Sequence, residues 1–469
     1  MRGVFRSTRR RGGVGVQDGR IDTSQCTPWP HGALLVGGAV RDLLLDRPVA
    51  DLDWSVPDPA AAARRHAAAL GGSVFTLDEE RDHWRVVGPQ GDHGEKRVTH
   101  DFVPSTADPV ADLERRDLTI NAIAARPDGS LLDPTGGVAD LRAGVVRMTS
   151  RSALEADAVR PLRAVRFAGV LGFTLDDQTA ATVSRTAARQ LADASLRPAS
   201  ERVRDELIAI VNGPGGANAL RLAADLGLLV TFLPELDATR GVVQGGLHHL
   251  DVFGHSVLAL ERLAANHPDA TTDLRLATLL HDIGKPATAM PVVGKRVTFH
   301  GHAKVGSVLA RRAMRRLRFG SHSVATVGDL VRLHMQPLPG DERAARRFVH
   351  RHRDALPDLL HLMIADREAA RGRLASAAGR LRYQEAMGRV IAVLEETPPA
   401  APLLSGHDVM RVLGLEPGPR VGEALDVVAE AVAVGDVRDV EDAERLLRSY
   451  ADAQGWTAQD GLGRSRSRA

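Results

Sequence analysis

Apolar and polar positions follow two different periods along the chain, and the change of period divides it. Up to about residue 147, short apolar runs with strand character alternate with helical ones, in the segments ALLVGGAV, DLDWSV, SVFTL, RVVG and RVTHDFV. This alternation predicts a mixed α/β domain with a small sheet. From Ser152 to about Leu236, apolar residues recur every three or four positions, which predicts helices.

Glycine- and proline-rich joints divide the chain further. A turn at Asn212–Gly216 lies inside the first helical region, Gly241–Gly246 opens a second one that runs to about Arg373, and Pro398–Pro402 precedes another helical stretch. We therefore predict a multidomain α+β protein with a flexible arm (1–30), a mixed α/β head (31–147), a helical neck (148–240), a second helical domain (241–375), a C-terminal helical region (376–455) and a flexible tail (456–469).

Composition narrows the class of protein. With 43% hydrophobic and 26% charged residues in 469, wholesale disorder is excluded, and a single cysteine, Cys26, excludes a disulfide scaffold. No apolar run is long enough for a membrane span, and no apolar core follows the arginines at 9–11, so we expect a cytoplasmic protein without a membrane partner. The net charge is +2 and aromatic residues make up 3% of the chain, so any RNA would be bound through backbone charge and shape.

The stretch LLVGGAVRDLLLDRPVADLDW carries the first candidate site. An apolar strand runs into Gly37-Gly38, where the missing side chains let backbone amides approach a phosphate, and Arg41 adds a cation where the chain turns helical. Asp51 and Asp53 follow at i and i+2, a spacing that points both carboxylates to one face of a strand. Two anions on one face repel each other, so a divalent cation is their natural partner.

These residues open a series of ordered motifs. GGAVRD at 37–42 and DLDW at 51–54 are followed by RRDLTINA at 115–122, DPTGG at 133–137 and DAVRPLRAVRF at 157–167. In this order the motifs resemble the class II tRNA nucleotidyltransferase and bacterial poly(A) polymerase family, over about the first 240 residues. The resemblance implies a nucleotidyltransferase head with a small polymerase-β-like sheet, in which Mg²⁺ ions held by Asp51 and Asp53 serve a two-metal transfer.

Further roles follow from the same resemblance. Asp101 alternates onto the strand face opposite its apolar neighbours and is our candidate for a third carboxylate, with a simple exposed strand residue as the alternative. The nucleotide-binding set is Gly37, Gly38, Arg41 and Arg116 for the incoming nucleotide, Asp117 and Asn121 for ribose and phosphate, Asp157 and Arg160 for the base edge, and Arg163 and Arg166 towards the phosphates.

Two features near the base-reading residues depart from the pattern. Asp157 and Arg160 are expected three apart on one helix, where a salt-bridged surface is the competing interpretation. The family often has Glu before the Asp, but this chain has Ala156, so one orienting hydrogen bond is absent. Pro161 stands where a helix interior would lose a backbone bond, so we expect the helix to start late or to kink.

The second helical domain carries a histidine-aspartate series. Its members are His255, His281, Asp282, His302, His334 and Asp366. Imidazoles beside carboxylates suit Mg, Mn, Fe or Ni. The series resembles the HD phosphohydrolase superfamily, which implies an all-helical domain that hydrolyses phosphate esters with a bound divalent metal. His255, His281, Asp282 and Asp366 would form the core set, and His302 and His334 would bring a second ion. Lys285 or a nearby group would steady the phosphate. A structural metal domain that helps to hold tRNA is the alternative.

The leading hypothesis is a tRNA nucleotidyltransferase that adds CCA from CTP and ATP without a nucleic-acid template, acting as a monomer or dimer with tRNA as its partner. The alternatives are a CC-adding enzyme, a poly(A) polymerase of the same family, or mainly an HD-type phosphohydrolase. The connection VPSTADPVADLE at 103–114 is short for the mobile loop that family members use to change from CTP to ATP, which favours CC addition. Against this, the glycine-containing segment 78–97 could supply the mobility.

Overall fold

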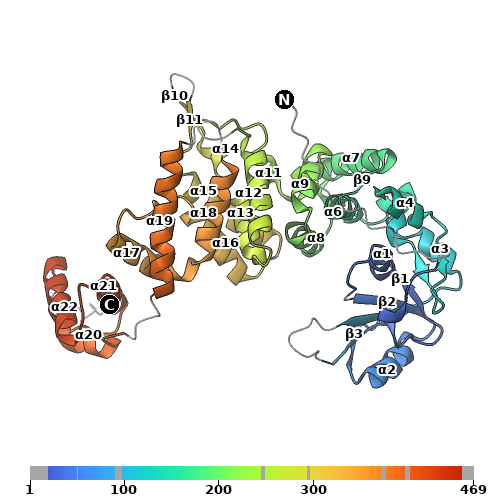
Figure 1. The fold of residues 1–469 in the computed structure, drawn as a ribbon, viewed down its shortest axis with the longest axis horizontal. Coiled ribbons are helices and arrows are strands. Elements are labelled where there is room, and N and C mark those ends of the chain that lie inside the picture. The colour runs from blue at the N-terminus through green and yellow to red at the C-terminus, as the bar shows by residue number, and fades with distance from the viewer. Residues whose placement is uncertain are drawn as a thin grey trace, which may run out of the picture. The chain divides into compact units, whose positions relative to one another are not determined.

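The computed structural model describes residues 20–49, 51–89, 98–244, 249–292, 296–370, 376–396 and 402–456. These residues form two compact units (Figure 1). The first contains the described residues up to Arg240, together with Ala264–Arg275 and Arg312–Ser321, and the second contains Gly241–Leu263, Leu276–Arg311 and the described residues from His322 onward.

A seven-stranded mixed sheet forms the head of the first unit, in the order β3-β4-β5-β2-β1-β6-β7. Its strands are β1 (Leu34–Val36), β2 (Asp51–Val56), β3 (Ser73–Asp78), β4 (His83–Val87), β5 (Thr99–Pro104), β6 (Ala124–Ala125) and β7 (Leu131–Leu132). The helices of the head are α1 (Gly38–Leu44), α2 (Pro59–Leu70), α3 (Pro109–Glu114) and α4 (Gly137–Ala143). The strands β2 and β5 are parallel neighbours, and the other strand pairs in the sheet are antiparallel. The predicted mixed α/β head is confirmed.

Alternation along β2 and β5 separates a core face from a polar face. Trp54 and Phe102, paired across the two strands, are fully buried. The helix α2 packs against this side of the sheet (Figure 1). Its His66 contacts the Phe102 ring. The residues between these apolar ones therefore point to the opposite face of the sheet.

The segment 20–30 differs from the predicted flexible arm. Arg20 pairs with Ser130 in an isolated bridge, the amide of Ile21 donates to the carbonyl of Gly129, and Cys26 is completely buried. Burial of Ile21 and Cys26 in the core of the head ties this part of the chain down, which its glycine and arginine content did not indicate. The rest of the predicted arm, and the predicted tail from residue 457 on, lie outside the described residues.

Short helices continue the first unit after the sheet. They are α5 (Arg151–Glu155), α6 (Arg160–Leu171), α7 (Asp177–Ala192), α8 (Ser200–Asn212), α9 (Gly216–Asp225), α10 (Leu229–Phe232) and α11 (Pro234–Asp237), with a strand pair β8 (Val145–Val146) and β9 (Thr174–Leu175). Gly169 lets α6 and α9 approach closely, since a Cβ there would lie 2.3 Å from the backbone nitrogen of Ala219. Pro161 lies in the first turn of α6, so the expected late helix start is confirmed.

The second unit is built almost entirely of helices. The helices from Gly241 onward are α12 (Val252–Asn266), α13 (Thr272–Leu280), α14 (Lys285–Thr288), α15 (His302–Arg316), α16 (Ser321–Leu333), α17 (Glu342–His352), α18 (Asp358–Ala369), α19 (Ala377–Glu396), α20 (Gly406–Leu413), α21 (Pro419–Ala433) and α22 (Val440–Gln454). A hairpin of β10 (Met290–Val292) and β11 (Arg296–Thr298) is an addition to the expected all-helical domain.

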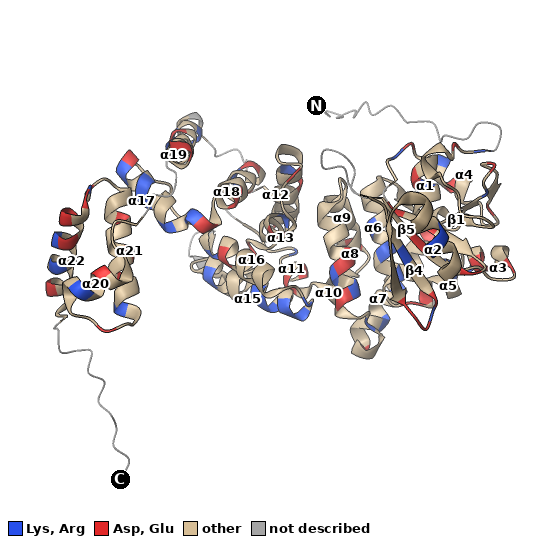
Figure 2. Cartoon of the chain, turned by 90° about the horizontal axis from the view of Figure 1, so that it is seen from below, with Lys and Arg blue, Asp and Glu red and all other residues tan. Residues whose placement is uncertain are grey.

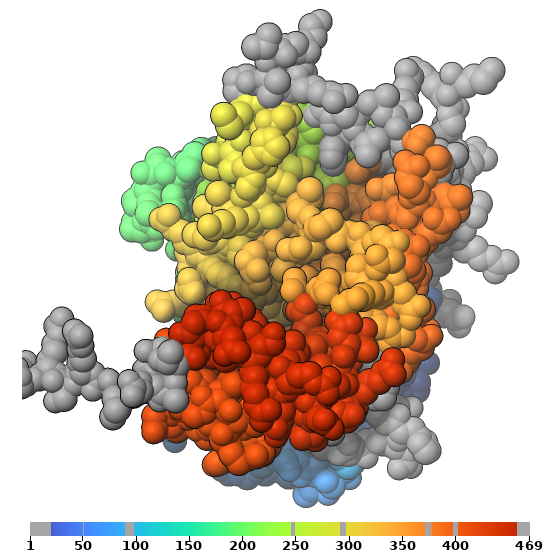
Figure 3. Space-filling model, turned by 90° about the vertical axis from the view of Figure 1, so that its left-hand side faces the viewer, coloured from blue at the N-terminus to red at the C-terminus, as the bar shows by residue number. Residues whose placement is uncertain are grey.

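The last three helices share a core of their own. Val409 on α20, Ala424 on α21 and Leu447 on α22 are fully buried together, and on the face shown in Figure 3 these helices form one continuous surface. Acidic and basic residues alternate along α22 (Figure 2), where Arg448 pairs with Glu444. Among the described residues, no helix combines the length and apolarity that crossing a bilayer requires.

Candidate functional site

A cavity of about 630 Å³ in the first unit gathers nearly all of the predicted nucleotide-site residues. Its lining is Gly37, Gly38, Arg41, Asp51, Asp53, Arg116, Asp117, Asn121, Asp157, Arg160, Arg163, Arg166, Phe167 and Arg202. Of the predicted nucleotidyltransferase residues, Asp101 alone is absent from this lining. Sequence motifs separated by more than a hundred residues therefore meet in one hollow.

The glycine pair shapes the floor of this cavity at the start of α1. Gly37 has φ +74°, and a Cβ there would lie 3.1 Å from Arg116 Nη1 and 3.3 Å from Asp53 Oδ2. A side chain at this position would push into the groups that bear charge, so glycine is required both by conformation and by space. Arg41, one turn along α1, donates from Nη1 to Asn121 Oδ1 at 2.7 Å and pairs with Asp42 at 2.9 Å. These bonds hold the Arg41 guanidinium at the wall of the cavity.

The strand carboxylates share one face, as their spacing predicts. Asp53 on β2 and Asp101 on β5 are directly paired in the parallel register, and both belong to the face opposite Trp54 and Phe102. Asp51 is exposed and accepts a hydrogen bond from Thr99 Oγ1. The register thus places Asp101 beside Asp53, which sequence alternation alone did not establish.

Arg85 on β4 forms an ion pair with the Asp101 carboxylate. Its Nε and Nη2 donate to the two oxygens of Asp101, each at 2.7 Å. In the described part of the chain, groups of three or more potential metal ligands within 4.8 Å of one another occur in the second unit. The strand carboxylates do not form such a group. Asp101 is therefore the partner of a guanidinium in this structure.

Asp53 experiences the crowding of negative charge that favours a cation. Burial, together with the nearby carboxylates of Asp101 and Asp51, raises the pKa of Asp53 to about 6, although Arg116 and Arg85 oppose the rise. A divalent cation would relieve both the desolvation and the repulsion, so the residues present fit the metal that the sequence pattern implies.

Arginines of α6 line the far wall of the cavity. Arg163 Nε donates to Asp117 Oδ2 at 2.6 Å, and Arg166 Nε donates to Glu206 Oε2 at 2.6 Å. The Phe167 ring lies under three guanidinium groups, with that of Arg166 4.0 Å from its centroid. These contacts fix cations around a cavity that could receive a triphosphate.

The base-reading pair is arranged differently from our expectation. Asp157 lies in the turn between α5 and α6, so it does not share a helix with Arg160. The physical reason is Pro161, which fits the first turn of a helix and starts α6 only at Arg160. Arg160 Nη1 donates to the carbonyl oxygens of Arg115, at 3.1 Å, and Ala153. Both side chains nevertheless line the cavity.

Sequence reasoning missed Phe167, Arg202 and Glu206. Phe167 ends the DAVRPLRAVRF motif, so its place in the motif could have flagged it. Arg202 and Glu206 lie on α8, outside the motifs, and Arg202 donates to both carboxylate oxygens of Asp157. Only their approach in space marks them.

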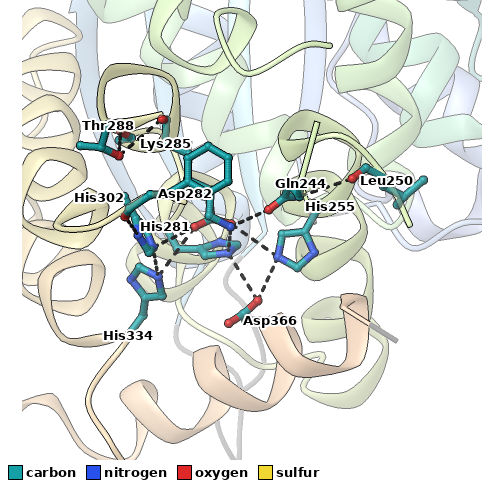
Figure 4. Close-up of polar contacts among 12 residues, drawn as sticks. Gln244, Leu250, His255, His281, Asp282, Lys285, Thr288, His302, His334 and Asp366 are labelled. Carbon is teal, nitrogen blue, oxygen red and sulfur yellow. Dashed lines mark hydrogen bonds and ion pairs between the residues drawn. The ribbon is translucent and has the colours of Figure 1, made fainter. Parts of the chain in front are cut away.

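The second predicted constellation converges inside the second unit (Figure 4). Two groups of ligand atoms each lie within 4.8 Å of one another: His255, His281 and Asp366, and Asp282, His302 and His334. Asp282 joins the two groups, since its Oδ2 is 3.1 Å from His281 Nε2 and its Oδ1 is 3.3 Å from His302 Nε2. The structure therefore brings together all six residues that the sequence singled out.

Backbone carbonyls fix which ring nitrogens face the centre. His281, His302 and His334 each place Nδ1 2.7–2.8 Å from the carbonyl oxygen three residues earlier, at Thr278, Phe299 and Val331. A carbonyl only accepts, so each Nδ1 carries the proton, and Nε2 of a neutral ring presents a lone pair. The Nε2 atoms of His302 and His334 face each other at 3.3 Å. Facing lone pairs at this distance repel unless a cation joins them, so this donor set fits a divalent metal.

Charges within the centre are strongly coupled. Burial opposes the imidazolium of His281, but the Asp282 and Asp366 carboxylates outweigh it and raise the His281 pKa to about 10. Burial, and then the neighbouring His281, lower the pKa of His334 to about 4. A proton on His281 thus occupies the position that suits a metal cation between the same carboxylates.

Lys285 has two polar partners beside the histidine-aspartate centre. Its Nζ donates to Asp282 Oδ2 and to Gln244 Oε1, each at 2.6 Å (Figure 4). These bonds hold the ammonium against the Asp282 carboxylate. Lys285 also lines the cavity beside the centre, so its role in steadying a phosphate stays a prediction. A cavity of about 900 Å³ adjoins the centre, and Phe299, Met363 and Tyr383 contribute an apolar wall to it.

Comparison with known proteins agrees with this arrangement. Residues 33–147 match the poly A polymerase head domain, 172–239 match the probable RNA and SrmB-binding site of polymerase A, and 248–371 match the HD domain. The chain is 51% identical to an A-adding tRNA nucleotidyltransferase of Deinococcus radiodurans, over 91% of this chain and 97% of that one. It is 43% identical to a CC-adding tRNA nucleotidyltransferase of Thermus thermophilus, over 89% of this chain and 93% of that one.

Solved structures share the fold. The CCA-adding enzyme of Bacillus stearothermophilus in complex with CTP matches with a TM-score of 0.63 at 22% identity, over 90% of this chain and 94% of that one. The matched domains and the relatives that align over nearly their whole length show the family: the chain belongs to the tRNA nucleotidyltransferase and poly(A) polymerase family, as an enzyme with a fused HD domain.

Proposed function

We propose that this chain extends the 3′ end of tRNA by transferring nucleotides from CTP or ATP, and that its particular reaction is addition of the terminal adenosine to tRNA ending in CC. The cavity that joins the glycine pair, the strand carboxylates and the arginines supports nucleotidyl transfer. The 51% identity to an A-adding relative, over nearly the whole of both chains, supports adenosine as the added nucleotide.

In this proposal each wall of the cavity has one task. The backbone amides at Gly37-Gly38, together with Arg41 and Arg116, bind the triphosphate. Asp51 and Asp53 hold Mg²⁺, and Asp101 is the candidate third ligand. The bound metal would neutralise charge and lower the pKa of the 3′-hydroxyl. Asp117 and Asn121 support the ribose, and Arg163 and Arg166 keep the α6 wall positive. The 3′-hydroxyl oxygen loses its proton to solvent and attacks the α-phosphorus, and pyrophosphate leaves with the electron pair of the broken P–O bond.

Base choice belongs to Asp157 and Arg160. A carboxylate accepts from an exocyclic amino group, and a guanidinium donates to the ring nitrogen beside it. Cytosine and adenine both offer an amino group next to an acceptor nitrogen, whereas uracil and guanine offer a carbonyl next to an N–H. The pair therefore suits CTP and ATP and rejects UTP and GTP.

Addition of the two cytidines is the second candidate. The helix α3 occupies Pro109–Glu114, so four residues separate β5 from it and leave little chain for a mobile loop. The 43% identical CC-adding relative points the same way. The competing segment 78–97 lies partly outside the described residues, from 90 to 97.

One assay separates these reactions. Purified enzyme with Mg²⁺ receives tRNA ending before CCA, after one C or after two, with CTP or ATP alone and then with both. Adenosine added only to ends in CC supports the proposal. Products that stop at CC favour the second candidate, conversion to CCA favours the full reaction, and long adenosine tracts on many RNAs favour a poly(A) polymerase.

We also propose that the HD centre holds Mg, Mn, Ni or Fe and hydrolyses phosphate esters. The fixed tautomers of His281, His302 and His334 and the adjoining cavity support this second activity. Metal analysis of the purified protein, followed by hydrolysis of p-nitrophenyl phosphate after reloading with each ion, tests it. Retained metal without hydrolysis of phosphate mono- or diesters would indicate a structural centre. We expect a cytoplasmic protein that is a monomer or a dimer. Light scattering at working concentration distinguishes the two oligomeric states.

A further inference from the structure

The helix α8 (Ser200–Asn212) reaches the nucleotide cavity with two side chains one helical turn apart. Arg202 lines the cavity, and Glu206 accepts hydrogen bonds from Arg166 at 2.6 Å and Arg163 at 3.5 Å. Residues four apart lie on the same face of a helix, so α8 presents a cation and an anion to this wall. The Glu206 bonds tie α8 to α6 and so fix where Arg202 stands.

Arg202 forms a bidentate ion pair with Asp157. Its Nη1 donates to Oδ1 at 2.8 Å and its Nη2 donates to Oδ2 at 2.7 Å, while the amide of Val159 donates to Oδ1 at 3.1 Å. Two parallel bonds from a planar guanidinium set both the plane and the rotation of a carboxylate, which a single bond would not. The neighbouring residue, Ala156, has no polar side chain to share this task.

The exposure of this pair argues against a role in stability. The side chain of Arg202 is 53% exposed and that of Asp157 is 27% exposed. Ion pairs open to solvent typically contribute about 0–1 kcal/mol to folding. A bidentate pair at the wall of a nucleotide cavity is better explained by control of direction, because Asp157 Oδ2 accepts one bond from Arg202 and keeps a lone pair for a further donor.

We propose that Arg202 is the positioning residue for base selection: it holds the Asp157 carboxylate in the orientation that accepts an exocyclic amino group. Arg160 is anchored separately, on the carbonyl oxygens of Arg115 and Ala153. The acceptor and the donor that face the base are thus set by different partners, the acceptor by α8 and the donor by the main chain. This inference rests on the proposed function, in which Asp157 and Arg160 read the base.

The test compares Arg202→Lys and Arg202→Gln with the unaltered enzyme. The ratio of kcat/KM for the preferred nucleotide, CTP or ATP, to that for UTP or GTP should fall about tenfold in both variants, because lysine keeps the charge but loses the bidentate pair. The kcat for the preferred nucleotide should change less than about threefold. Arg204→Gln is the matched control: Arg204 lies on the same helix but bonds to Asp205 and to the Arg318 carbonyl. Its ratio should stay within about twofold.

A double-mutant cycle with Asp157→Ala identifies the route of the effect. If Arg202 acts through Asp157, Arg202→Gln has no further effect on base discrimination once the carboxylate is gone. Independent, multiplying losses would overturn the proposal, as would equal slowing with all four nucleotides or full rescue by lysine. Equilibrium binding of each nucleoside triphosphate with Mg²⁺, in the absence of tRNA, gives the same ratios. An enzyme that binds nucleotides with this dependence but extends no tRNA would contradict the proposed function and leave the role of Arg202 standing.

Discussion

The two sites of this chain collect similar groups in opposite ways. The strand site keeps Asp51 exposed and balances Asp101 with Arg85, whereas the helical centre buries His255, His281 and Asp282 almost completely. An open carboxylate pair suits Mg²⁺ that is bound jointly with substrate phosphates. A buried set with fixed imidazole tautomers suits an ion that stays with the protein. The difference in exposure therefore favours an exchangeable metal at the strand site and a resident metal at the helical centre, although both sites use aspartates.

The largest expected effect is at the strand site. Asp53→Ala should reduce nucleotide addition by about a thousandfold or more, since it removes the half-buried carboxylate that is paired in register with Asp101. Metal bound at the helical centre should stay unchanged. Single-turnover addition and elemental analysis on the same preparation measure both. Addition within tenfold of the parent enzyme would contradict our assignment of the metal site.

The converse change separates the sites from the other side. The double variant His281→Ala, Asp282→Ala removes the residue that joins the two ligand groups, so bound metal and any phosphate-ester hydrolysis should be lost. Nucleotide addition should stay within about threefold, because its cavity is lined by other residues. Circular dichroism checks that the variant is folded. A comparable collapse of addition in a folded variant would mean that the two centres are not independent.

Asp101 sharpens the comparison, because the strand site neutralises it with an arginine. Asp101→Asn should slow addition about 10- to 100-fold if the carboxylate joins the metal after release from Arg85. Arg85→Ala should then lower the Mg²⁺ concentration required for half-maximal rate. If Asp101 serves only as the partner of Arg85, both variants will show the Mg²⁺ requirement of the parent, and Asp101 will not be a ligand.

Buried imidazoles of the head contrast with those of the helical centre. His100 Nδ1 accepts from Trp54 Nε1 at 3.1 Å and lies 3.0 Å from His66 Nε2, which therefore donates. The N–H groups of Trp54 and His66 therefore satisfy the lone pair of His100 Nδ1, and no metal is required there. Burial lowers the pKa of His66 to about 4, and burial together with the neighbouring His66 lowers that of His100 to about 4.

These pKa values set a direction for stability. Both pKa values lie below the ordinary 6.5, so between pH 6.5 and 4 the unfolded chain binds more protons than the folded chain. The contribution of the two neutral histidines to stability is therefore complete above pH 6.5 and is lost as the pH falls to 4. The loss should be about 3 kcal/mol for each histidine, because a tenfold change in a proton-binding constant corresponds to about 1.4 kcal/mol. Urea unfolding followed by tryptophan fluorescence measures it. His66→Phe should flatten the dependence, while exposed His31→Gln should preserve it; an unchanged slope in the His66 variant would refute the explanation.

Much of the fold could be predicted locally. Alternation in DLDWSV and RVTHDFV placed strands that the structure contains, and helical periodicity placed the regions after Ser152. The sequence-based predictions are wrong where contacts between distant residues, or the start of a helix, determine the structure. Segment 20–30 has a polar composition, yet Ile21 and Cys26 are buried against the head. Asp157, expected on one helix with Arg160, lies in the turn before α6, because Pro161 fits the first turn of a helix and α6 begins only at Arg160.

The sequence by itself determined the chemistry: which residues could bind phosphate, which could bind a metal, and in which order they occur. Those signals are local, because a glycine pair, an Asp-x-Asp strand or a His-Asp step has its meaning within a few residues. Only the tertiary structure decided the pairings: Arg85 with Asp101, Lys285 with Gln244, and Arg202 with Asp157. Each joins side chains from different strands, helices or turns, and a bond of under 3 Å between them depends on sheet register and helix packing, which no local pattern records.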